Sequence, residues 1–230
     1  MPPRPVSDLL ARPRLTETLR SNLESPMTVV AADAGCGKTT LVAEFVRSQS
    51  RPVVWYQLDH TDADPAVFLG YVANGIKGAV PSFGDAVFDY LSEANEELVR
   101  FPERAADLLI NEILQSVEHP LILVLDDYHH IGVETPVHRI VDRLLQYSSD
   151  LVHLMITTRD LPPLAMMKRR TQAAVHIITR EDLLFTDDEV RDLYKTTLGI
   201  SLDDRQVAEY RNRTHGWVTG LQLVRQVAEE

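Results

Sequence analysis

Short apolar runs recur along the chain, and most of them end in polar residues. The clearest is Leu121–Leu125, which contains no polar residue before Asp126 and Asp127 end it. An uninterrupted apolar run of this kind is typical of a strand buried on both faces, as in a parallel sheet covered by helices. The same pattern predicts strands at 29–32, 52–58, 151–157 and 175–179.

Stretches with apolar residues at helical spacing separate these runs. Residues 81–101 have weak periodicity and many polar groups, so a loop with room for one short helix is expected there. Strands that alternate with helices at this rhythm predict an α/β fold with a doubly wound, mainly parallel, five-stranded sheet. The predicted helices lie at 12–23, 37–46, 65–80, 105–117 and 137–145.

From Glu181 onward the pattern changes to helices only. Apolar residues at helical spacing predict three of them, within 190–198, 207–210 and 217–228. Thr186, followed by three acidic residues, indicates a capped helix start. We therefore place a domain boundary near Thr179, with an α/β domain at 1–180 and a small all-helical domain at 181–230.

Composition and charge narrow the class of protein. The net charge of −11 over 230 residues describes a surface that repels nucleic acid and anionic lipid. The basic cluster 168–170 is interpreted as a solvated helix face. One cysteine excludes an internal disulfide and indicates a reducing compartment. No apolar run reaches membrane-spanning length and residues 1–15 lack a signal-peptide core, so a cytoplasmic protein without membrane contact is expected.

The segment Ala32–Thr39 reads ADAGCGKT, which is the phosphate-loop pattern G-x-x-x-x-G-K-[ST] with alanine in place of the first glycine. It lies where the mechanism requires it, between a predicted buried strand and a predicted helix. Gly35 and Gly37 allow backbone conformations in which successive N–H groups turn toward an anion. A plain strand-to-helix connector is the alternative, and the flanking elements favour the phosphate loop.

The loop backbone and three side chains supply the predicted nucleotide contacts. Lys38 adds a charge beside the β- and γ-phosphates, Thr39 is placed to ligate Mg²⁺, and Thr40 is in reach of the α-phosphate. We interpret Cys36 as filler at a variable loop position, although a helix start is expected to lower its pKa. The predicted cofactors are ATP or ADP with Mg²⁺, and the predicted nucleotide-binding residues are Ala34, Gly35, Cys36, Gly37, Lys38, Thr39 and Thr40.

Charged residues at the ends of two later strands complete the predicted site. Asp126 emerges at the carboxyl edge of the sheet, where α/β proteins bind ligands, and is assigned with Thr39 to Mg²⁺. Asp127 is the candidate to orient or deprotonate the attacking water. Arg159 reaches the γ-phosphate if its strand lies beside the phosphate-loop strand. The alternatives are two acids that only begin a loop and a surface arginine paired with Asp160.

Two neighbouring histidines, His129 and His130, raise the question of a further metal site. Adjacent histidines are expected to point to different faces, and no third ligand stands at a usual spacing. We interpret them as polar loop residues. The predicted catalytic residues are therefore Lys38, Asp127 and Arg159.

Several motifs, in this order and spacing, resemble the STAND class of signal-transduction P-loop ATPases, in particular the MalT-like group of large ATP-binding LuxR-type transcriptional regulators. The resemblance covers about 10–227. It rests on ADAGCGKTT at 32–40, LVLDDYH at 123–129, TTRDLPP at 157–163, LLFT at 183–186 and THGWVTGLQL at 214–223.

The resemblance implies a nucleotide-switched signalling ATPase. Family members rest as an ADP-bound monomer, exchange to ATP when an inducer binds a downstream sensor domain, and then self-associate; slow hydrolysis resets the switch. It also implies that 181–230 is a lid and that Lys38, Thr39, Thr40, Asp126 and Arg159 hold their predicted roles. Related lids carry Gly-x-Pro near the adenine, whereas this chain has GWV at 216–218, so the residue that meets the base stays open.

Family regulators continue into sensor and DNA-binding domains that are absent from this chain. Residues 207–226 superficially resemble a helix-turn-helix, but apolar Leu221 and Leu223 stand where base-reading polar side chains are needed. Lid packing explains them better, and no direct DNA contact is expected. Two other functions remain open: a housekeeping ATPase or small-molecule kinase, and a nucleotide-binding interaction module without significant hydrolysis.

Overall fold

The structure is a computed structural model that describes residues 2–4, 10–93, 98, 100–148, 150–168 and 175–221. The statements below concern these residues. Residues 169 and 170 of the basic cluster and the part of the last predicted helix beyond 221 lie outside them.

Five parallel strands form one sheet in the order β2-β3-β4-β1-β5. The phosphate-loop strand β1 lies between β4 and β5, with Val29 in register with Ile156 of β4 and Ile177 of β5. The predicted five-stranded parallel sheet is thereby confirmed. The strands are β1 (Met27–Ala31), β2 (Val53–Gln57), β3 (Leu121–Asp126), β4 (Val152–Thr158) and β5 (Val175–Ile178).

Helices connect the strands close to where the pattern predicts them. Proline occupies the first turn of α1, α3 and α6, where its missing N–H costs no hydrogen bond. Helix α6 begins three residues before its predicted start for this reason, and α4 is the short helix within 81–101. The helices of this part are α1 (Pro13–Ser21), α2 (Lys38–Arg47), α3 (Pro65–Ala79), α4 (Ala86–Glu93), α6 (Pro102–Ser116), α7 (Val137–Tyr147) and α8 (Ala165–Lys168).

Three short 3₁₀ helices complete the α/β part: η1 (Asn22–Glu24), η2 (His60–Ala63) and η3 (Tyr128–Ile131). Asp64 accepts hydrogen bonds from two backbone N–H groups at the start of α3. Asp64 is therefore the N-cap of this helix. Among the described helices, none combines the length and the apolar character needed to cross a membrane.

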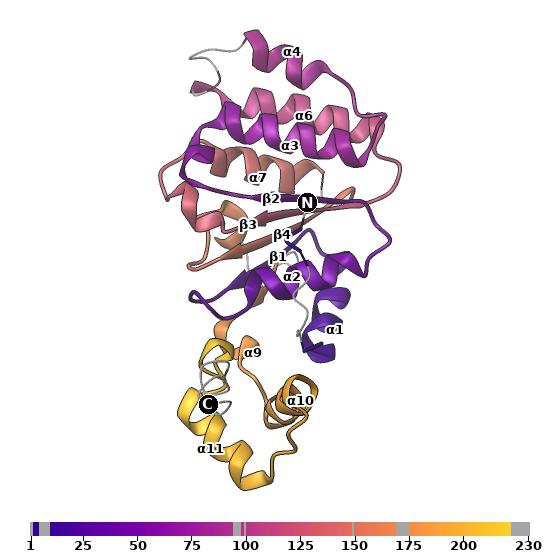
Figure 1. Cartoon of the computed structure of the whole chain (residues 1–230). Helices are drawn as coiled ribbons and strands as arrows, with labels where there is room; N and C mark the ends of the chain where they lie inside the picture. Colours follow the sequence, from indigo (N-terminus) through magenta and orange to yellow (C-terminus); the bar gives the residue numbers. More distant parts are fainter. Residues whose placement is uncertain are drawn as a thin grey trace.

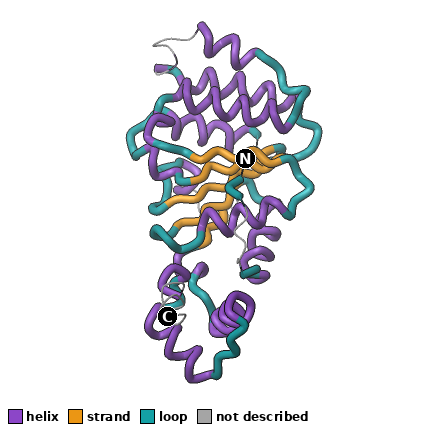
Figure 2. The backbone as a smooth tube through the Cα atoms, in the orientation of Figure 1, coloured by secondary structure: helices purple, strands orange, loops and turns teal. Residues whose placement is uncertain are grey.

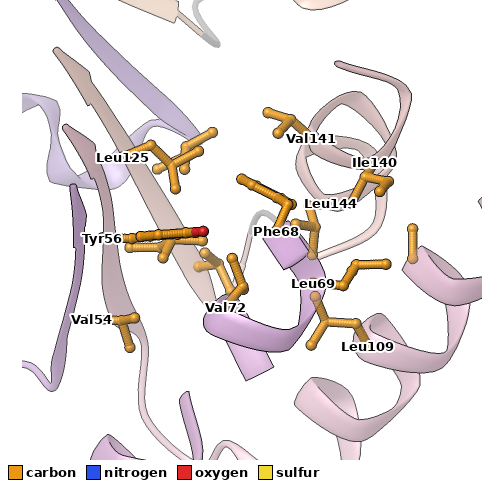
Figure 3. Close-up of a cluster of buried hydrophobic side chains, with 14 of the residues drawn as sticks. Val54, Tyr56, Phe68, Leu69, Val72, Leu109, Leu125, Ile140, Val141 and Leu144 are labelled. Atoms are coloured by element: carbon orange, nitrogen blue, oxygen red, sulfur yellow. The ribbon is translucent and has the colours of Figure 1, made fainter. Parts of the chain in front are cut away.

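Helices cover both faces of the sheet (Figures 1 and 2), and a separate apolar core is buried on each face. Along β3, Leu121, Leu123 and Leu125 face the core shared with α3, α6 and α7, whereas Ile122 and Val124 face α1 and α2. Figure 3 shows how Phe68, Leu69 and Val72 of α3 fill the space between the strands and α7 in the larger core. Because both faces are covered, β3 contains no exposed position, which explains its uninterrupted apolar run.

After β5 the described chain is helical, as predicted. Capping boxes start three of these helices: Thr179 pairs with Asp182, Thr186 with Glu189, and Asp203 with Gln206. This C-terminal helical part, at the bottom of Figure 1, has a small core of its own that includes Val207 and Leu221. Its helices are α9 (Arg180–Leu183), α10 (Asp187–Leu198) and α11 (Asp204–Thr214).

Candidate functional site

The phosphate loop follows β1 and ends at the first residue of α2. Gly35 and Gly37 have φ angles of 74° and 80°, in the left-handed region that glycine adopts without strain. Gly37 caps α2, so the positive end of the helix faces the loop. The Lys38 ammonium donates to the backbone carbonyl of Asp33 at 3.0 Å, which curls the side chain over the loop.

The helical part touches this loop directly. The hydroxyl of Thr219 donates to the carbonyl of Gly35 at 2.8 Å. A Cβ atom on Gly35 would lie 2.7 Å from the same hydroxyl oxygen and 3.2 Å from the Trp217 ring. Gly35 is therefore required for the close approach of the helical part as well as for its φ angle.

Asp126 is the centre of a buried polar network beside the loop. Its Oδ1 atom accepts from Thr39 at 2.8 Å and from Thr157 at 2.6 Å. Burial raises the pKa of the Asp126 carboxyl, and the two hydroxyl groups partly offset this. Its Oδ2 atom is buried and has no hydrogen-bond partner among the described residues. A free carboxylate oxygen beside the Thr39 hydroxyl fits the oxygen ligands that Mg²⁺ prefers.

The structure places Asp127 and Arg159 on the same cavity as the phosphate loop. Strand β4 pairs with β1, which is the condition under which Arg159 was expected to reach the γ-phosphate. Asp127 has φ 58°, and its backbone N–H donates to the Thr157 hydroxyl at 2.9 Å. This left-handed turn directs the chain away from the strand immediately after Asp126.

A cavity of about 430 Å³ joins these groups to the helical part. That volume lies in the range of small-molecule and cofactor sites, about 300–1,000 Å³. The end away from the phosphate loop is lined by apolar Leu10, Phe185 and Leu193. The full lining is Leu10, Arg12, Ala34, Gly35, Cys36, Gly37, Lys38, Thr39, Thr40, Leu41, Glu44, Asp127, Arg159, Phe185, Leu193, Val218 and Thr219.

Arg12, which the sequence did not single out, joins the start of the chain to the helical part. Its guanidinium makes two hydrogen bonds to the Glu189 carboxylate, at 2.8 and 3.1 Å, and donates to the carbonyls of Leu183 and Leu184. It also lies 4.2 Å from the centroid of the Phe185 ring. Burial alone would raise the pKa of Glu189, but the hydrogen bonds from Arg12 and the Thr186 N–H, together with the charges of Arg12 and Arg14, outweigh it and hold that pKa below its ordinary value.

Two sequence-based interpretations are wrong. The helix start was expected to lower the pKa of Cys36, but this residue is buried, and the burial raises the thiol pKa despite the opposing charge of Lys38. The ligand atoms of Asp127, His129 and His130 lie within 4.8 Å of one another, so the two histidines do not point apart. The αL turn at Asp127 and the 3₁₀ geometry of η3 bring together side chains that an extended segment would separate.

Comparison with known proteins agrees with this geometry. A family described as AAA domain matches residues 22–165. The HTH-type transcriptional regulator MalT of Serratia proteamaculans is 29% identical over 223 residues, which cover 96% of this chain and 24% of the relative. MalT of Cronobacter sakazakii is 27% identical with the same coverage. The chain thus spans about a quarter of the length of these relatives.

Solved structures with the same fold include two archaeal ATPases. One is a signal transduction ATPase with numerous domains (STAND) that carries a tetratricopeptide repeat sensor, from Pyrococcus horikoshii: TM-score 0.64, 18% identity, 93% of this chain and 29% of that chain. The other is a Walker-type ATPase of Pyrococcus abyssi: TM-score 0.59, 14% identity, 95% of this chain and 68% of that chain. The resemblance to STAND ATPases and MalT-like regulators is confirmed.

Proposed function

Because this chain belongs to the AAA domain family and is a P-loop ATPase domain related to MalT regulators and STAND ATPases, we propose that it is an ATP/ADP switch module. In this proposal, slow Mg²⁺-dependent hydrolysis of ATP controls self-association of a larger signal-transducing regulator. The observation that carries it is a cavity bounded by the phosphate loop on one side and the helical part on the other.

The phosphate end of the cavity supports nucleotide binding. The left-handed backbone at Gly35 and Gly37 and the start of α2 support binding of the β-phosphate by backbone N–H groups, and Lys38 exchanges its contact with the Asp33 carbonyl for phosphate oxygens. Thr40 follows on the same helix turn, where its hydroxyl meets the α-phosphate. Apolar Leu10, Phe185 and Leu193 provide the surface for the base at the far end.

The hydrolytic end uses the groups that converge beside Thr39. Mg²⁺, when bound, neutralises charge on the β- and γ-phosphates. Thr39 and Asp126 are the residues that hold it, and Thr157 fixes the orientation of the Asp126 carboxylate. Asp127 orients the attacking water and accepts its proton, while Arg159 compensates charge on the γ-phosphate.

The helical part is proposed to be the lid of the switch, within a domain at 181–230 that follows an α/β domain at 1–180. Thr219 contacts the loop at Gly35, and Val218 lines the cavity beside it. A change at the phosphates therefore changes what the lid contacts. We further propose that the chain is part of a cytoplasmic LuxR-type regulator in which movement of this lid is passed to the sensor and DNA-binding domains. The residues of this chain make no direct DNA contact in this proposal.

Two alternatives predict different behaviour. A housekeeping ATPase or small-molecule kinase turns over quickly with an acceptor substrate. An interaction module without significant hydrolysis binds nucleotide but does not consume it. Neither alternative requires ADP to stay bound through purification, whereas a resting ADP state does.

The first experiment identifies the nucleotide that the purified chain retains. We expect ADP in the wild type and its loss from Lys38→Ala, because removing a charge-assisted contact costs about 1.5–3 kcal/mol, or about 10- to 150-fold in affinity. Lys77→Ala, on α3 away from the cavity, is the matched control and retains ADP. An empty wild-type site that also fails to bind added ATP or ADP would overturn the proposal.

A second experiment tests hydrolysis by single-turnover kinetics. We expect Asp127→Asn to retain nucleotide and to lose about 100-fold or more in turnover, as for loss of a general base. Asp160→Asn, which follows Arg159 but lies outside this cavity, is the control. Equal, measurable turnover in the wild type and Asp127→Asn would show that Asp127 is not the base. No turnover in a wild type that binds ATP would favour the interaction-module alternative.

A further inference from the structure

The loop after β3 gathers three metal-binding side chains that the proposed hydrolysis does not use as a group. Asp127, His129 and His130 each offer a ligand atom, and these atoms lie within 4.8 Å of one another. The two imidazole rings lie 4.3 Å apart between centroids, tilted by 32°. His129 and His130 lie on the short 3₁₀ helix η3, and Asp127 is the residue that caps its start directly after β3.

His129 gives a second, independent observation. Both of its ring nitrogens are buried, and neither has a hydrogen-bond partner among the described residues. A buried polar atom without a partner costs about 1–3 kcal/mol. His138 differs: its ring nitrogens contact the Tyr128 hydroxyl at 2.9 Å and the Gly132 carbonyl at 3.0 Å. The ring nitrogens of His138 therefore have hydrogen-bond partners within the fold, whereas those of His129 have none among the described residues.

The local charges are compatible with a cation. The negative charge of Asp127 interacts electrostatically with His129, and that of Asp59 interacts with His130. Lys38 and Arg159 oppose these carboxylates at longer range. A neutral imidazole is the form that ligates metal, and both ring nitrogens of His129 are free of hydrogen bonds to the described residues.

The donor set indicates which ion is suited. Two imidazoles and a carboxylate suit Zn²⁺ and similar divalent transition metals, whereas Mg²⁺ prefers oxygen alone. Nitrogen and oxygen ligands at about 2.0–2.2 Å from a tetrahedral ion lie about 3.3 Å apart. Small side-chain rotations would bring the three ligand atoms from their present separations, within 4.8 Å, to this distance. The fourth coordination position of the ion would stay open to water or a phosphate oxygen.

We propose that Asp127, His129 and His130 form a site for a divalent transition-metal ion, separate from the Mg²⁺ position at Thr39 and Asp126. Metal binding at this site is independent of the proposed switch function. One consequence rests on that function: an ion held by Asp127 withdraws the carboxylate from the attacking water and slows hydrolysis.

The test is Co²⁺ titration of the tag-free chain in Mg²⁺-free buffer, followed by visible absorption, with Zn²⁺ as competitor. We expect one Co²⁺ per chain with the intense band of a tetrahedral or five-coordinate site. Lys38→Ala, which is expected to lack nucleotide, keeps this band, so metal on nucleotide phosphates is distinguished from the protein site. His119→Ala, an exposed histidine outside the loop, binds as the wild type does.

His130→Leu is the decisive variant because His130 is exposed, so its loss leaves the fold intact, as circular dichroism can verify. We expect at least about tenfold weaker Co²⁺ binding, since the loss of even a supporting group typically costs 10- to 100-fold. His129→Gln is expected to show the same loss. Wild-type affinity in both variants, or no band in the wild type, overturns the proposal.

Turnover separates the site from its consequence. Zn²⁺ is expected to slow single-turnover hydrolysis in the wild type and to do so less in His130→Leu. If Co²⁺ binds through the histidines while Zn²⁺ leaves turnover unchanged, the metal site stands and the assignment of Asp127 to the attacking water is wrong.

Discussion

The two sides of the nucleotide cavity are held in place by different forces. On the sheet side, Asp126 and Thr157 come from strands whose residues are buried on both faces between two large apolar cores. On the other side, the helical part has a small core of its own. Prominent polar contacts tie it to the remainder: the Arg12 ion pair with Glu189 and the Thr219 hydrogen bond to the loop.

Because of this difference, we expect the sheet side to be rigid and the helical part to respond to the ligand. Apolar burial does not depend on the ligand, so we expect the sheet to hold the backbone at Asp126 and Thr157 in one arrangement with and without nucleotide. Directional polar contacts depend on the groups that face them, and a small core provides little resistance to local opening. We therefore expect nucleotide to change the position of the helical part more than that of the sheet.

The largest expected effect comes from the sheet side. Phe68→Ala leaves a cavity between α3 and the strands, and we expect a loss of about 3–5 kcal/mol in the free energy of unfolding. Chemical denaturation measures it, with Leu114→Ala, which is exposed on α6, as the control. A loss below about 1 kcal/mol would contradict a rigid apolar core on this face.

Breaking the ion pair tests the other side. Arg12→Leu removes the two shortest cationic contacts of the largely buried Glu189 carboxylate and leaves it the longer contact to Arg14 at 3.4 Å and the Thr186 N–H, which costs about 1–3 kcal/mol. We expect this loss of stability to appear as faster amide hydrogen exchange in α9 and α10, while exchange in the sheet is unchanged. Adding Glu189→Leu is expected to restore much of the protection; faster exchange throughout β3 and β4 would show that the two regions do not open separately.

Acid is expected to weaken the sheet side through one buried histidine. The Nδ1–H of His153 donates to the Ser25 carbonyl at 2.6 Å, and burial lowers the pKa of this histidine to about 4. The unfolded chain therefore takes up the proton first, and stability is lost as pH falls below the ordinary value of about 6.5.

Between pH 7 and pH 5 this loss is about 2 kcal/mol. Denaturation at several pH values measures it, and His153→Gln is expected to flatten the dependence while His119→Gln, at an exposed position, leaves it. An unchanged slope in His153→Gln would assign the acid sensitivity to other groups.

The smallest effect concerns the hydrogen bond between the helical part and the loop. Thr219→Val removes one hydroxyl, worth about 1 kcal/mol, so ADP release is expected to be about fivefold faster. Thr219→Ser keeps the donor and is the matched control. Stopped-flow release of a fluorescent ADP analogue measures both, and equal rates in all three proteins would remove this contact from the switch.

The sequence predicted the elements whose signals are local. The apolar run of β3 and the phosphate-loop pattern identified Asp126 and Thr39, and the structure joins these two side chains by a hydrogen bond. Thr157 was missed as a partner of Asp126, because a threonine at a strand end carries no sign of which neighbouring strand it faces. Its role depends on β4 lying beside β3.

Groups whose partners are distant in sequence were also missed. Arg12 carries no recognisable motif, and its partner Glu189 is 177 residues away. The convergence of His129 and His130 with Asp127 was wrongly excluded, because the expectation assumed an extended segment. The chain turns from the buried strand β3 into η3 at Asp127, and the left-handed backbone there brings the three side chains together.

The sequence by itself determined the parallel sheet, the phosphate loop and the acid that follows β3, because hydrophobic period and backbone freedom at glycine act over a few residues. Only the tertiary structure decided which strands are neighbours, how the helical part meets Gly35, and which charges share the cavity. These contacts join residues from about 30 to more than 180 positions apart, and their energies depend on burial that exists only after the chain has folded.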